Sequence, residues 1–167
     1  MKDEEVINRL WTSLCLFTSK EAELLITRTS ERSITAKVMQ YMSYIFNEYD
    51  VDAEYNLDFS KPQVQSKRIK DEINSKSRLI VPDIIVHKRG STEYNLLALE
   101  YKIYRGFGLK IEHDILKLKK LTKLSGRMNF KYQLGALVIL ELYGESPNYK
   151  VKLFKNGREV QNLIFKF

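Results

Sequence analysis

Cysteine and histidine are scarce in this sequence, with one Cys and two His among 167 residues. A lone thiol cannot close an intramolecular disulfide, and there is no Cys or His cluster to hold Zn²⁺. Unbroken apolar stretches are also short. The longest covers five residues, Ala136 to Leu140, and cannot cross a membrane as a helix. The acidic first residues are not followed by the apolar core of a signal peptide, so we expect a reduced, cytoplasmic protein without a membrane partner.

Low-complexity segments, internal repeats and linker-like stretches are missing as well. Apolar residues make up 44% and charged residues 29% of the chain, which is typical of a globular protein with a real core. This composition excludes an intrinsically disordered chain and a collagen-like one. At this length we expect a single domain.

Positive charge is concentrated in one part of the chain. The net charge is +7, and residues 102–131 contain nine Lys or Arg against two acids, Glu112 and Asp114. That stretch therefore accounts for the whole net charge. A localised basic field indicates a polyanionic partner such as nucleic acid, although a solvated basic helix face is an equally simple interpretation of charge alone.

Hydrophobic periodicity predicts helices, then strands, then a helix between further strands. Helices are expected over residues 4–18, from a capping-box pattern at 18–21 to about Ile26, over 31–48 with Ser30 as N-cap, and over 109–124. Strands are expected over 51–58, 78–88 with an interruption at Pro82, 94–104 and 132–142, and a polar loop over 60–77. Segments 149–154 and 161–167 should form a hairpin around Asn156-Gly157. This order predicts an α/β domain.

The strand predicted over 94–104 carries charge where a central strand should be apolar. Alternation places Glu100 and Lys102 on one face with Ala98, and Tyr101 on the other. Both faces are apolar up to Glu100, so the strand should be covered on both sides. Buried charges are unfavourable unless they are paired or bind a metal ion. A Glu100–Lys102 ion pair is the structural alternative to a functional site.

A second unusual carboxylate, Asp83, follows Pro82 inside the preceding apolar strand. Proline removes a donor from the ladder and marks a bulge or bend, which re-aims neighbouring side chains. If the Arg89-Gly90 turn joins the two strands as a hairpin, Asp83 and Glu100 converge. Two such carboxylates repel each other unless a divalent cation joins them. The alternative is that Asp83 is only a polar interruption of the strand.

Two further acids lie on the apolar sides of their predicted helices. Glu31 falls within the apolar arc of helix 31–48, and Asp114 within that of helix 109–124. Their inward direction indicates a buried polar site. The helix dipole for Glu31, and a cap or core hydrogen bond for Asp114, are the simpler explanations. The opposite face of helix 109–124 could follow a phosphate backbone, and it holds Lys119, Lys120 and Lys123.

The spacing of these residues resembles a known family. Pro82-Asp83, sixteen intervening residues and Glu100-Tyr101-Lys102 are similar to the PD-(D/E)XK nuclease motif. Residues 28–142 also resemble the core of that superfamily in the order of their elements: an upstream helix with Glu31, three strands with Asp83 and Glu100-x-Lys102 on consecutive ones, a basic helix and another strand. Tyr101 replaces the aliphatic residue that is usual between Glu and Lys, and it should point to the opposite face.

The resemblance implies an α/β restriction-endonuclease-like core, with a central mixed β-sheet flanked by helices and with extra N-terminal helices. Within a single nuclease-like domain of residues 1–167, residues 1–28 would be a helical extension, 29–142 the core and 143–167 a C-terminal hairpin. The similar branch is a stand-alone bacterial or mobile-element one. We find no separate target-recognition domain, so we expect little sequence specificity.

For function, the resemblance implies a Mg²⁺- or Mn²⁺-dependent endo- or exonuclease, with DNA favoured over RNA. Asp83, Glu100 and the main-chain carbonyl of Tyr101 would bind the metal. Lys102 would position the attacking water or stabilise developing charge, and Glu31 would bind the metal through water or orient Lys102. A homodimer is compatible with this interpretation. Nucleic-acid contacts are expected from Lys110, Lys119, Lys120, Lys123 and Arg127.

Two other classes of protein compete with the nuclease. One is a catalytically silent nucleic-acid-binding module on the same fold, against which the intact acidic pair and Lys102 argue. The other is a partner-binding protein, such as an immunity or assembly factor, whose charges are simply solvated. Retention on nucleic acid at moderate salt would separate the second class from the nuclease.

Overall fold

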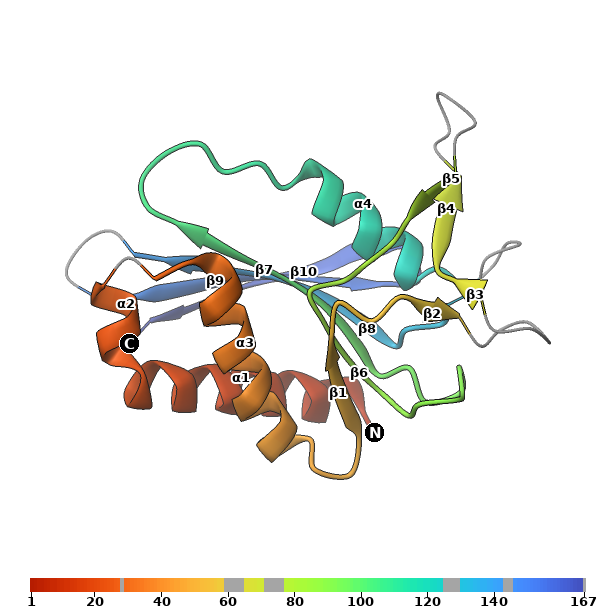
Figure 1. The fold of residues 1–167 in the computed structure, drawn as a ribbon, viewed down its shortest axis with the longest axis horizontal. Helices are drawn as coiled ribbons and strands as arrows, with labels where there is room; N and C mark the ends of the chain where they lie inside the picture. The colour runs from red at the N-terminus through yellow and green to blue at the C-terminus, as the bar shows by residue number, and fades with distance from the viewer. Residues whose placement is uncertain (28, 59–64, 71–76, 125–129, 143–145, 167) are drawn as a thin grey trace.

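In a computed structural model, the described part of the chain begins with three helices and continues as strands, with one further helix between two of those strands (Figure 1). The helices are α1 (Asp3–Lys20), α2 (Ala22–Ile26), α3 (Glu31–Ile45) and α4 (Glu112–Leu121). The main strands are β1 (Asp50–Ala53), β6 (Ile84–His87), β7 (Leu97–Tyr104), β8 (Leu134–Glu141), β9 (Asn148–Lys155) and β10 (Arg158–Lys166). Two short ladders pair β2 (Leu57–Asp58) with β3 (Gln65–Ser66), and β4 (Arg68–Lys70) with β5 (Ser77–Leu79). The structure describes every residue except 28, 59–64, 71–76, 125–129, 143–145 and 167.

The main strands form one mixed sheet in the order β1-β6-β7-β8-β9-β10. All neighbours in it are antiparallel except β7 and β8, which are parallel. A parallel pair needs a crossover connection, and α4 lies in the connection between these two strands. The expected α/β fold with a central mixed sheet flanked by helices is confirmed.

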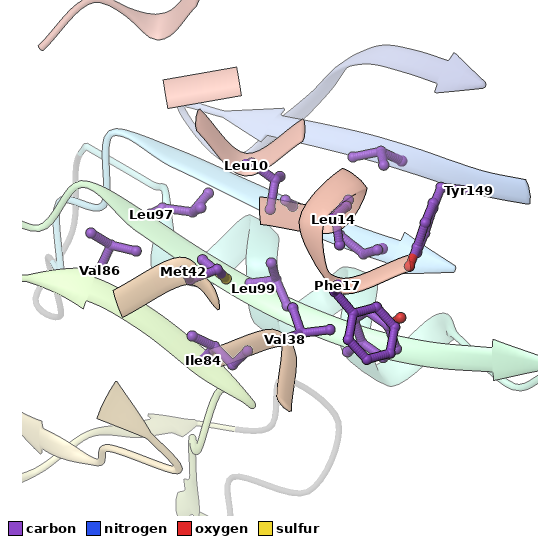
Figure 2. Packing of buried hydrophobic residues seen from close by; sticks show 14 of the residues in the cluster. Leu10, Leu14, Phe17, Val38, Met42, Ile84, Val86, Leu97, Leu99 and Tyr149 are labelled. Atoms are coloured by element: carbon purple, nitrogen blue, oxygen red, sulfur yellow. The ribbon is translucent and has the colours of Figure 1, made fainter. Parts of the chain in front are cut away.

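Each face of the sheet has its own core. On one face α1 and α3 pack against the strands, and Figure 2 shows Leu14 and Val38 among the side chains gathered around Leu99. On the other face Leu118 of α4 belongs to a second cluster with Ala98. The first five residues of β7 are therefore buried, as expected for a strand that is apolar on both sides. No helix within the described ranges has the length and apolarity to cross a membrane.

Local signals at two positions produce the predicted structure. The Ser30 hydroxyl accepts a hydrogen bond of 3.2 Å from the main-chain N–H of Ser33, so it caps α3 and makes Glu31 the first helical residue. Asn156 and Gly157 have φ angles of 53° and 77° and join β9 to β10. Positive φ at both central residues is typical of a type I′ turn, which confirms the hairpin.

Three local predictions are wrong. Thr18 does not cap a second helix, because α1 continues to Lys20 and the Thr18 hydroxyl donates to the carbonyl of Leu14 within it. The strand expected over 51–58 stops at Ala53, because Glu54 adopts a left-handed φ of 49°. The chain then pairs β2 with β3 in a separate ladder, so the polar segment 60–77 contains strands and is not all loop.

Candidate functional site

Asp83 is positioned by the end of the β6–β7 ladder. The ladder stops at the pair Ile84↔Leu99, since Pro82 has no N–H to continue it. The Asp83 Oδ2 atom instead accepts a hydrogen bond of 2.7 Å from the main-chain N–H of Tyr101. Both main-chain polar groups of a strand residue point toward the same neighbour, so the Tyr101 carbonyl also faces this open edge.

Glu100 lies on the α4 side of β7 and has an exposed fraction of 0%. Its Oε2 atom accepts a hydrogen bond of 2.5 Å from Nζ of Lys117, on α4. Its Oε1 atom is also buried, and no donor in the described part of the chain reaches it. Burial first, and then the nearby Asp83 carboxylate, raise the pKa of Glu100 to about 9. A carboxylate oxygen left without a partner in the interior is unfavourable, so the isolated protein keeps the proton on Glu100, and a bound cation is another way to satisfy this oxygen.

Alternating charges continue from Glu100 across the end of the sheet. Lys117 also contacts Asp114 at 3.1 Å, and Asp114 contacts Lys102 at 3.6 Å. Lys102 in turn donates to Glu31 Oε1 at 3.1 Å. Burial by itself lowers the pKa of both lysines, but their carboxylate neighbours outweigh it and leave both pKa values raised. Both side chains are therefore ammonium ions at neutral pH.

Glu31 reaches this cluster from the first turn of α3. Its Oε1 accepts the Lys102 hydrogen bond, and its Oε2 accepts one of 3.0 Å from the main-chain N–H of Ile103. The carboxylate therefore ties the start of α3 to the end of β7. The inward direction predicted for Glu31 is correct, and the helix dipole is not its only interaction.

The cluster contains more negative than positive charge. When all its groups are ionised, four carboxylates face two ammonium groups, which leaves a charge of −2. The groups are Glu31, Asp83, Glu100 and Asp114 against Lys102 and Lys117. Burial also raises the pKa of Asp83, so the isolated protein resists full ionisation. One divalent cation would balance this excess.

The donor atoms present fit a hard divalent cation. Asp83 and Glu100 offer carboxylate oxygens, and the Tyr101 carbonyl faces the same edge. Mg²⁺ and Mn²⁺ prefer such oxygen ligands and keep several waters. No group of three His, Cys, Asp or Glu side chains suited to a metal occurs among the described residues, so main-chain oxygen and water would complete the coordination.

A groove of ≈ 410 Å³ opens to solvent beside two members of this cluster, Asp83 and Glu31. It lies between the first turns of α3 and the end of β1. Small side chains leave the space, and the lining consists of Glu31, Arg32, Thr35, Ala36, Ala53, Glu54 and Asp83. The main-chain N–H of Glu54 donates to the carbonyl of Asp83 at 3.2 Å, which fixes this rim relative to the carboxylate.

Three of the predicted basic residues gather at a second groove, of ≈ 520 Å³, between the end of α4 and the β9–β10 turn. Lysines from α4 and from the segment after it lie on one side of this groove, and an arginine of β10 lies on the other. The charged lining residues are Lys119, Lys120, Lys123 and Arg158. Lys110 is exposed before α4, and Arg127 lies outside the described residues. From Asp114 to Lys120 the helix axis rises by about 9 Å, so this basic groove is separate from the carboxylates.

The structure brings together the four side chains that the sequence singled out, namely Glu31, Asp83, Glu100 and Lys102. Their pairing differs from the simplest expectation, because Glu100 contacts Lys117 and Lys102 contacts Glu31 and Asp114. Sequence reasoning placed Asp114 on the apolar side but missed Lys117. The sequence does contain a signal for Lys117: it follows Asp114 by three residues, so the two charged side chains lie on one side of the helix.

Comparison of this chain with protein-family models, curated proteins and solved structures gives no match in any of the three. The residues themselves therefore carry the functional argument. They comprise the buried Glu100, the half-buried Asp83, two ammonium groups and an open groove at one end of a mixed sheet.

Proposed function

We propose that the protein is a metal-dependent nuclease that hydrolyses phosphodiester bonds, with DNA as the favoured substrate. The observation that carries this proposal is the unpartnered Oε1 atom of the buried Glu100, beside Asp83 in a cluster whose ionised charge is −2. Such an arrangement is unfavourable without a cation and useful with one.

The order of the elements supports a PD-(D/E)XK-type core. Glu31 begins a helix, Asp83 precedes β6, and Glu100 and Lys102 lie on β7, which pairs with β6. The basic helix α4 follows and leads into the parallel strand β8. This is the order that the motif resemblance implied for residues 28–142. Residues 1–28 and the β9–β10 hairpin add to either end of it.

Asp83, Glu100 and the Tyr101 carbonyl would hold Mg²⁺ or Mn²⁺. Bound there, the ion would act as a Lewis acid toward the phosphate and a bound water. The chain's own contribution is to keep the donors in place: the Tyr101 N–H fixes one oxygen of Asp83, and Lys117 fixes one oxygen of Glu100. Each contact leaves the second oxygen of its carboxylate for the cation.

Lys102 would supply the positive charge nearest to the reacting phosphate. Its ammonium lies at the open end of β7, and the side chain keeps an exposed fraction of 20%. Glu31 holds this ammonium through Oε1 while Oε2 is used by Ile103 N–H. Of the two roles considered for Glu31, its geometry favours the orientation of Lys102 over a water-mediated metal contact. Lys102 would then position water or stabilise developing charge on the phosphate.

The basic groove would bind the nucleic-acid backbone. Lys119, Lys120, Lys123 and Arg158 offer ammonium and guanidinium groups, which contact phosphates and carry little sequence information. Substrate recognition by this surface would therefore be largely independent of sequence.

Cleavage assays on plasmid DNA, labelled oligonucleotides and RNA test the proposal. Wild-type protein should cut with Mg²⁺ or Mn²⁺ and not with EDTA. Asp83→Asn and Glu100→Gln should each lose at least about 100-fold in rate, the scale of removing one catalytic group. Lys37→Gln, a change on the far side of α3 from Arg32, is the control and should cut normally. Binding without cleavage would favour the silent module, and the absence of both would favour a partner-binding protein.

A further inference from the structure

An ion pair spans the mouth of the groove beside Asp83. The guanidinium of Arg32, in the first turn of α3, donates to Glu54 Oε1 at 2.9 Å. Both residues line the groove, on opposite sides of it. Their side chains are largely exposed, with fractions of 85% for Arg32 and 61% for Glu54.

Glu54 is held in this position by its own main chain. Its φ of 49° ends β1, and its N–H donates to the carbonyl of Asp83 at 3.2 Å. A left-handed conformation is uncommon for Glu, so this contact helps to maintain it. The main chain of Glu54 is consequently fixed at the rim, next to a proposed metal ligand.

Arg32 is the cation of this groove. The other charged side chains among its described lining residues are acidic, namely Glu31, Glu54 and Asp83. A polyanion that reaches Asp83 through this opening meets three carboxylates and one guanidinium. A guanidinium group can donate two parallel hydrogen bonds to one phosphate. The carboxylates that line the groove repel a phosphate, so its attraction to this groove must come from Arg32.

We propose that Arg32 binds a backbone phosphate next to the one that reacts, and that Glu54 holds the guanidinium across the groove until nucleic acid arrives. This inference rests on the proposed function and assigns a substrate contact at its entrance. Exchange of Glu54 for a phosphate is inexpensive, because an exposed ion pair contributes little to stability. The phosphate then takes the place of the Glu54 carboxylate on the same guanidinium, with no change in the buried cluster.

Binding in EDTA separates this role from catalysis. The affinity for a labelled oligonucleotide is measured by fluorescence anisotropy from 0.05 to 0.3 M salt, for wild type, Arg32→Gln and Glu54→Gln. On a duplex oligonucleotide, one lost phosphate contact changes the salt slope by about 0.9, which corresponds to about eightfold weaker binding at 0.1 M salt. Glu54→Gln frees Arg32 and should tighten binding.

The ion pair between Lys37 and Glu21, 3.4 Å long and also involving α3, supplies matched controls. Lys37→Gln and Glu21→Gln make the same charge changes away from the groove and should shift affinity less than about twofold. The proposal predicts opposite effects from Arg32→Gln and Glu54→Gln, both larger than those of the controls.

Any of the following outcomes would overturn the proposal. If Arg32→Gln and Glu54→Gln both weaken binding, the pair only ties α3 to β1. If their effects on affinity equal those of the controls, Arg32 contributes only to the overall electrostatic potential of the protein and does not contact a phosphate. If wild-type protein binds no nucleic acid, the proposed function is wrong as well. If wild-type protein binds and cuts nucleic acid but Arg32→Gln leaves the affinity unchanged, only this inference is wrong.

Discussion

Replacement of Glu100 by Gln should remove part of the pH dependence of the free energy of unfolding. Glu100 is fully buried, and burial together with Asp83 raises its pKa from 4.5 to about 9. Gln has nearly the same shape and carries no charge. Lys117 keeps Asp114 as a partner at 3.1 Å, so the change does not leave a buried ammonium alone.

The sign follows from proton binding. Between pH 4.5 and about 9, the folded wild type keeps the Glu100 proton while the unfolded chain releases it. The folded state therefore binds more protons, and this group's contribution is complete below pH 4.5 and is lost progressively as pH rises to about 9. At 1.36 kcal/mol per pKa unit, a rise from 4.5 to about 9 makes the full loss on the order of 6 kcal/mol. The free energy of unfolding of Glu100→Gln does not decrease for this reason as pH rises, because Gln does not titrate.

Urea denaturation in EDTA at pH 5, 7 and 9 measures the effect. The free energy of unfolding of Glu100→Gln, relative to wild type, should increase steadily with pH. In a separate series without EDTA, Mn²⁺ should stabilise wild type and leave Glu100→Gln unchanged; a concentration of 100 times Kd would add about 2.7 kcal/mol. Parallel pH profiles for the two proteins would refute the reasoning, because Glu100 would then titrate normally.

Other expectations concern the nucleic-acid surface, Lys102 and the packing of α4. Lys119→Gln/Lys120→Gln/Lys123→Gln should weaken nucleic-acid binding and lower the salt slope by up to about 3; an unchanged slope in filter binding would remove the basic groove from the interface. Lys102→Met should abolish cleavage but retain Mn²⁺ binding by calorimetry, since Lys is not a ligand; loss of metal binding would contradict its assigned role. Gly135→Val should destabilise by about 1–3 kcal/mol in thermal melting, because a Cβ there lies 3.1 Å from Thr122 Cγ2 and 3.3 Å from Leu118; a neutral effect would show that α4 can shift.

The central strand and its charges were predictable from the sequence. Continuous apolar character up to Glu100 indicated a strand covered on both faces, and the interior position of β7 has that property. Pro82 marked the break that lets Asp83 turn toward Tyr101. Ser30 located the start of α3 and therefore placed Glu31 in the first turn of that helix. In each case a local rule fixed the geometry.

The pairing within the cluster depended on tertiary packing. Period-2 alternation puts Glu100 and Lys102 on one face but does not determine which ammonium each carboxylate contacts. That choice follows from the placement of α4, which brings Lys117 over Glu100 and Asp114 between the lysines. The end of β1 was missed for a similar reason: Glu54 alternates correctly with its neighbours, yet its contact with the Asp83 carbonyl selects a left-handed conformation.

The most direct test of the metal site is a crystal soaked with Mn²⁺ and measured for anomalous scattering. The account predicts a peak between the carboxylates of Asp83 and Glu100, near the Tyr101 carbonyl, that disappears in Glu100→Gln. A peak elsewhere, or none at a Mn²⁺ concentration that supports cleavage, would contradict it.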